Sequence, residues 1–207
     1  MATPGLSRRG FGGPIGLRGV PPLIEDQLFE VVESVLDPLG FRMEDGEEYR
    51  EPALDVLRYY RRPVKLHWLP FLGRSQAVVA VVRQPVDVGL SGSKADYRAL
   101  MGRLALAASG RFPPSRALGF GSIGLTAVVL TPEPIAAGDD ELLKGALGGG
   151  PGRSRAVPLG VIRLNLGQEA MSHQLSGGPD GLFPEPVALA DALTVRFRRF
   201  VPLIEWD

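Results

Sequence analysis

The stretch with the most chemically suggestive side chains interleaves cations with aromatic rings between positions 58 and 68. It reads Arg-Tyr-Tyr-Arg-Arg-Pro-Val-Lys-Leu-His-Trp and contains no acidic residue. Cations beside stackable rings suit single-stranded nucleic acid or another phosphate-bearing partner. The same pattern is typical of an edge strand, where charges and a proline prevent unwanted pairing. The side chains that form this candidate binding patch are Arg58, Tyr60, Arg61, Arg62, Lys65, His67 and Trp68.

Two short motifs resemble cofactor-binding or catalytic signatures but lie in the wrong context. Residues 119–124 read Gly-Phe-Gly-Ser-Ile-Gly, which matches the dinucleotide fingerprint. That fingerprint must follow a strand and open a helix, whereas these glycines lead into a predicted strand. Residues 91–94 have the Ser-x-x-Lys form of penicillin-binding enzymes, but the chain contains no Lys-Thr-Gly. Ser93, with Asp96 three residues later, is better explained as a helix cap, so we predict no catalytic residue and no cofactor.

Residue types that ligate metals are not arranged as a metal site. His67 and His173 are the only histidines, and neither has a partner at helical spacing. Five carboxylates lie between positions 44 and 51, a run typical of a solvated hairpin tip, and their spacing matches no calcium loop. The absence of cysteine excludes disulfides, thiolate metal sites and cysteine nucleophiles. We therefore predict no metal site.

The composition limits the classes of partner. Lys+Arg and Asp+Glu are equal at 23 each, so no global field steers the chain toward nucleic acid or an anionic membrane. No apolar run approaches the ~20 residues that span a bilayer. We expect a cytoplasmic protein whose partner is another protein or a second copy of itself, and we regard nucleic acid as the less favoured partner.

The elements that position these residues are organised around residues 77–82, which read Ala-Val-Val-Ala-Val-Val. An unbroken apolar run this short predicts a strand that is covered on both faces. The spacing of apolar residues, together with helix-ending Gly and Pro, predicts helices over 22–39, 93–109 (ended by Gly110), 139–147 and 186–200. Further strands are predicted over 41–50 (with a turn at Asp45-Gly46), 54–68, 125–130 and 157–166. Residues 168–184 are predicted to be irregular.

From residue 77 onward the predicted order is strand, helix, strand, helix, strand, helix. That alternation predicts a three-layer α/β domain with a mixed, mostly parallel sheet flanked by helices. An N-terminal helix and an antiparallel hairpin extend it, and an α+β arrangement is the alternative. Residues 1–20 are rich in Gly and Arg and poor in apolar residues, so we predict a flexible tail before a single globular domain over 21–207.

The helix–hairpin–strand–helix–strand order resembles, in topology alone, the core of restriction-endonuclease-like domains. Those enzymes hold a metal with an Asp on one strand and a Glu-x-Lys on the next. This chain contains no Glu-x-Lys, and Arg83-Gln84 follows the central strand instead. The resemblance therefore carries no activity with it.

Three functions follow from the sequence. The leading hypothesis is a soluble, intracellular, non-enzymatic binding or assembly module, which a flat apolar patch would favour. The alternative is a nucleic-acid-processing, restriction-endonuclease-like domain, either an active enzyme or a catalytically degenerate relative. The third is a small-molecule enzyme with a site built from scattered residues, which a deep pocket lined by converging polar groups at the carboxyl ends of the strands would favour.

Overall fold

The structure is a computed structural model that describes residues 25–44, 54–64, 75–84, 93–112, 122–136, 138–147, 155–176 and 183–198. Its elements are α1 (Glu25–Leu36), β1 (Arg42–Glu44), β2 (Asp55–Val64), β3 (Ser75–Arg83), α2 (Lys94–Arg111), β4 (Ile123–Leu130), α3 (Asp140–Leu143), β5 (Ala156–Asn165), β6 (Ala170–Leu175) and α4 (Glu185–Arg198). The predicted tail at 1–20 and the turn at Asp45-Gly46 lie outside the described residues. None of the described helices is long and apolar enough to cross a membrane.

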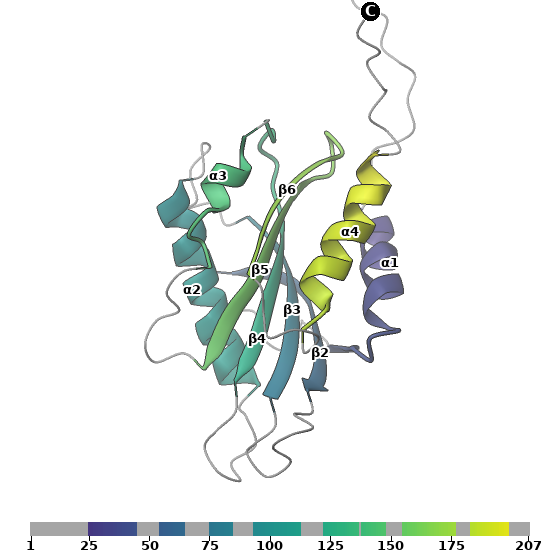
Figure 1. Ribbon diagram of the computed structural model, residues 1–207, viewed down its shortest axis with the longest axis vertical. Helices are drawn as coiled ribbons and strands as arrows, with labels where there is room; N and C mark the ends of the chain where they lie inside the picture. The colour runs from purple at the N-terminus through teal and green to yellow at the C-terminus, as the bar shows by residue number, and fades with distance from the viewer. Residues whose placement is uncertain are drawn as a thin grey trace, which may run out of the picture.

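The strands form one sheet in the order β1-β2-β3-β4-β5-β6. Figure 1 shows α2 and α3 on one side of this sheet and α1 and α4 on the other. The predicted three-layer mixed sheet, with its N-terminal helix, is confirmed. The balance within the sheet differs from the expectation, because two pairings are parallel (β3–β4 and β4–β5) and three are antiparallel. The additional antiparallel pairing comes from β6, which the sequence pattern did not indicate.

The predicted central strand is confirmed as β3. Every residue from Ala77 to Val82 is fully buried, because β3 is covered on both faces. Val78, Ala80 and Val82 pack in one apolar cluster with α2, and Ala77, Val79 and Val81 pack in a second with α1 and α4. Full burial of a valine contributes roughly 1.5–3 kcal/mol, so this strand anchors both layers.

Helix α2 begins as predicted and ends later than predicted. The Ser93 side chain accepts a hydrogen bond from the Asp96 backbone N–H, and the Asp96 carboxylate accepts one from the Ser93 backbone N–H. This reciprocal pair confirms the capping box. The expectation that Gly110 ends the helix is wrong, because α2 continues to Arg111. The buried ring of Phe112 packs edge-on against Tyr59 at 5.5 Å, and this contact holds the last turn on the sheet.

The prediction of an irregular segment over 168–184 is wrong where β6 forms. Residues 170–175 pair antiparallel with β5, and His173, predicted to lie in a loop, is part of this strand. Glu169, in the turn before β6, has a positive φ of 53°. Most side chains of this strand are only half-buried, so the position does not require apolar residues. Its sequence, Ala-Met-Ser-His-Gln-Leu, accordingly has no strong apolar alternation that would predict a strand. Pairing with the buried strand β5 therefore determines the conformation of this segment.

Candidate functional site

The candidate binding patch lies mainly on β2, where Arg58, Tyr60 and Arg62 share one face of the sheet as predicted. The Arg58 guanidinium donates to Glu33 Oε1 of α1 at 2.5 Å and lies 3.7 Å above the ring centroid of Phe29. The Tyr60 hydroxyl donates to the same Glu33 oxygen at 3.1 Å. Burial raises the pKa of Tyr60 to about 12, partly offset by the hydrogen bond with Arg58. These side chains join β2 to α1.

The other two described arginines of the patch are also paired with carboxylates. Arg61 points to the opposite face and donates to Glu44 of β1 at 2.9 Å from Nε. Arg62 donates to Glu185, the fully buried first residue of α4, at 3.3 Å. Arg61 thus links β2 to the neighbouring strand β1, and Arg62 links the sheet to helix α4.

Three predicted members of the patch, Lys65, His67 and Trp68, lie outside the described residues. Strand β1 covers β2 only from Tyr59 to Arg61. Among the described residues, no strand pairs with the outer side of β2 beyond that short pairing. Pro63 lies in this part of β2, which agrees with the expected place of a proline in a sheet. Binding of phosphate by the patch stays a prediction.

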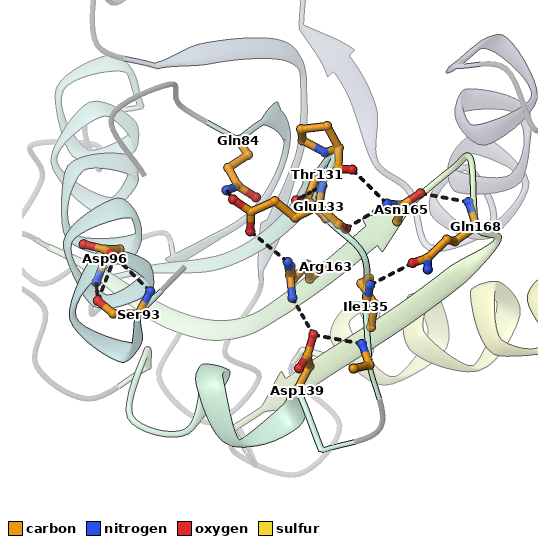
Figure 2. A network of polar contacts seen from close by, with 12 residues as sticks. Gln84, Ser93, Asp96, Thr131, Glu133, Ile135, Asp139, Arg163, Asn165 and Gln168 are labelled. Atoms are coloured by element: carbon orange, nitrogen blue, oxygen red, sulfur yellow. Dashed lines mark hydrogen bonds and ion pairs between the residues drawn. The ribbon is translucent and has the colours of Figure 1, made fainter. Parts of the chain in front are cut away.

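A second polar constellation lies at the carboxyl ends of the three parallel strands β3, β4 and β5 (Figure 2). Arg163, on β5, donates to Glu133 Oε2 at 3.1 Å and to Asp139 Oδ2 at 2.9 Å. Gln84, which follows β3, donates its amide N–H to the other oxygen of Glu133 at 3.0 Å. The side chain of Arg163 is 2% exposed and that of Glu133 is 7% exposed. We call these four residues the carboxyl-end network.

The loop from β4 to α3 is held in place around this network by side-chain amides. Asn165 donates to the carbonyl oxygens of Pro132 and Glu133, and its own Oδ1 accepts from the backbone N–H of Gln168. Gln168 in turn accepts from the backbone N–H of Ile135 at 2.8 Å. These hydrogen bonds satisfy backbone groups of the loop that have no partner in the sheet. They therefore give the network a defined geometry.

Tyr97, in the first turns of α2, approaches the network from the helical layer. Its side chain is fully buried, and Arg163 Cζ lies 5.8 Å from its ring centroid. Burial raises the pKa of Tyr97 to about 12, with the positive charge of Arg163 acting in the opposite direction. The phenol is therefore neutral at physiological pH and can donate or accept a hydrogen bond there.

A further arginine lies between two carboxylates at the start of β2. Arg83, the last residue of β3, donates to Glu25 of α1 at 2.8 Å and to Asp55 of β2 at 3.0 Å. The hydrogen bonds that Arg83 donates to both carboxylates raise the pKa of its guanidinium. Within the described residues, no group of three or more His, Asp and Glu side chains is arranged to hold a metal ion.

The described residues of the Ser-x-x-Lys and glycine motifs take structural roles. Ser93 caps α2, and Gly124 lies inside β4. A Cβ at Gly124 would lie 2.5 Å from both Leu159 and Phe183, so glycine is required there for close approach. The first glycines of the dinucleotide-like motif lie outside the described residues.

Sequence reasoning missed the carboxyl-end network. Arg163 occurs in the middle of an apolar strand, and a charged residue at a position of that kind is a signal that a buried partner exists. Its partners Glu133 and Asp139 follow a different strand, so spacing along the chain does not reveal them. Comparison of the chain with protein-family models, curated proteins and solved structures finds no match.

Proposed function

We propose that this protein is a non-enzymatic assembly module in which two copies pair through the exposed edge of β6. The observation that carries the proposal is the contrast between the two edges of the sheet. The edge formed by β1 and β2 carries several arginines and a proline, whereas Ala170–Leu175 contains neither a charged residue nor a proline. Within the described residues no strand pairs with the outer side of β6, and sheet edges that lack charges and proline are where strands add to a sheet.

The hydrogen-bond pattern defines which backbone groups of β6 face outward. The N–H of Ser176 bonds to the carbonyl of Leu159, so even-numbered residues face β5. Odd-numbered residues, Met171, His173 and Leu175, therefore direct their backbone groups away from the sheet. The N–H of His173 is bonded by the carboxylate of Asp140 at 3.1 Å, which agrees with this direction.

An antiparallel pair of β6 strands centred on His173 is self-complementary. It places Met171 of one copy opposite Leu175 of the other, so apolar side chains meet across the axis. Asp140 must release the His173 N–H when the pair forms. The exposed carboxylate of Asp140 thus competes with the second copy for one backbone donor.

The absence of catalysis in this proposal is supported by the pairing of neighbouring carboxylates with one arginine at each of two places. At one place Arg163 bridges Glu133 and Asp139, and at another Arg83 bridges Glu25 and Asp55. A metal ion would have to displace a guanidinium at either place. We also propose a cytoplasmic location, with which the cysteine-free composition is compatible.

Sedimentation equilibrium of the full chain tests this function. We expect a monomer–dimer equilibrium that His173→Lys weakens by about fivefold or more, because the change places two like charges opposite each other. Met43→Lys adds the same charge at the opposite edge, where Met43 is 56% exposed, and serves as the matched control. Asp140→Ala, which frees the His173 N–H, is expected to strengthen the dimer. A wild-type chain that stays monomeric up to about 0.5 mM would contradict the proposal.

A second candidate is a nucleic-acid-binding domain related in topology to restriction-endonuclease-like cores. It is favoured by the antiparallel pair β2–β3 followed by the parallel pair β3–β4, with Asp55 beside Arg83 on the next strand. If it is correct, a single-stranded oligonucleotide binds with a salt slope of roughly 0.7 per neutralised phosphate. Replacing Arg58 and Arg62 together then flattens that slope. We expect no binding at physiological salt, because both arginines already pair with carboxylates.

A further inference from the structure

Four buried hydrogen-bonding atoms at or beside the carboxyl-end network have no partner among the described residues. One is Gln84 Oε1, and the other three are Arg163 Nε, the hydroxyl of Tyr97 and the hydroxyl of Ser172. The last three residues are 2%, 0% and 5% exposed. An unpaired buried polar atom is costly, and one network rarely leaves several of them unpaired.

Arg163 Nε and the two hydroxyls come from three elements that meet over one face of the sheet. Arg163 and Ser172 are direct cross-strand partners in the β5–β6 pair, so their side chains lie on the same face. Tyr97 of α2 lies against the Arg163 guanidinium on that face. Glu133 and Asp139 accept hydrogen bonds from the two terminal nitrogens of Arg163, which orients the guanidinium and leaves Nε as the nitrogen without a partner.

We propose that these atoms form a binding site for a small uncharged amide. The Arg163 Nε–H donates to the carbonyl oxygen, and the two hydroxyls can accept from the amide N–H or donate to the same oxygen. An anion is disfavoured because one guanidinium faces two carboxylates, which leaves the cluster with one net negative charge. The place agrees with the general preference of ligands for the carboxyl ends of parallel strands.

Acetamide and acetate are a suitable pair of probes because they have nearly the same shape and differ in charge. We expect acetamide to bind the full chain saturably, with a dissociation constant on the order of millimolar for so small a ligand. The binding should shift the Arg163 Nε–H resonance in nuclear magnetic resonance spectra. Acetate should not bind at the same concentrations. This comparison uses the wild-type chain and needs no variant.

Two variants locate the site. Tyr97→Phe removes one hydroxyl and keeps the ring, and we expect it to weaken acetamide binding by about fivefold or more. Tyr60→Phe makes the same change on the opposite face of the sheet and should leave acetamide binding unchanged. Ser172→Ala should weaken binding like Tyr97→Phe. The proposal is overturned if acetamide does not bind saturably, which would leave ordered water as the partner of these atoms, or if acetate binds more tightly, or if Tyr97→Phe has no effect.

Discussion

Arg163 and Glu133 form an ion pair of 3.1 Å in which both side chains are almost completely buried, at 2% and 7% exposed. Glu133 also accepts a hydrogen bond from Gln84 of the neighbouring strand end. The pair therefore joins the ends of β3, β4 and β5 in a region from which water is largely excluded. Buried pairs of this kind stabilise a fold chiefly by leaving no charge unpaired.

Removing one partner of this pair should destabilise the protein strongly. We expect Arg163→Met to lower the free energy of unfolding by about 3–5 kcal/mol, because Glu133 and Asp139 are left without their cation. Urea denaturation followed by circular dichroism measures the change. Lys144→Ala removes an exposed partner of Glu141 and is the control, for which we expect no measurable change. Equal stability of Arg163→Met and wild type would contradict the burial of this network.

Ser93 should act as a helix cap and not as a nucleophile. We expect Ser93→Ala to lower the free energy of unfolding by about 1 kcal/mol, because the first turn of α2 loses a side-chain acceptor. Ser93→Thr keeps the hydroxyl and should retain most of that stability. A fluorophosphonate probe should not label the protein, and labelling at Ser93 would overturn the assignment.

Glu185 should make stability depend on pH. Burial raises the pKa of its carboxyl, and the charge of Arg62, its nearest described cation, only partly opposes this. Above the unfolded value of 4.5 the folded protein then holds more protons than the unfolded chain, so stability falls as pH rises through the folded pKa. We expect Glu185→Gln to remove this decline, measured as unfolding free energy between pH 4 and 8.

Glu141 is the matched control for that measurement, because its pKa is shifted in the opposite direction. The hydrogen bond from Lys144 lowers the pKa of the exposed Glu141 carboxyl. Its contribution is therefore present above its unfolded pKa and is lost as pH falls through the folded value. If Glu141→Gln and Glu185→Gln change the pH profile in the same way, the assignment of Glu185 as a desolvated carboxyl is incorrect.

Replacing either of two glycines by alanine should change the free energy of unfolding, in opposite directions at the two positions. At Gly124 a Cβ would lie 2.5 Å from the side chains of Leu159 and Phe183, so Gly124→Ala should lower the free energy of unfolding by roughly 1–3 kcal/mol. At Gly110, inside α2, a Cβ meets nothing within 4 Å. Gly110→Ala should therefore raise the free energy of unfolding by about 0.5–1 kcal/mol. Thermal denaturation of the two variants compares them directly.

Elements whose signals are local could be predicted from the order of the amino acids alone. The apolar run at 77–82 marked the central strand, since burial on both faces requires apolar residues throughout. Ser93 and Asp96 marked the start of α2, since a capping box needs only residues three apart. The amphipathic spacing of α1 likewise follows from the helical repeat, whatever the helix packs against.

Features that depend on contacts between distant segments could be found only from the folded chain. Ala170–Leu175 became a strand because β5 supplies its hydrogen bonds, and α2 continued past Gly110 because the Phe112 ring packs on Tyr59. Arg163 met Glu133 because parallel strands bring their carboxyl ends to one edge of the sheet. The partners in each case are joined by hydrogen bonds or packing between segments far apart in the chain, and no local spacing encodes such a contact.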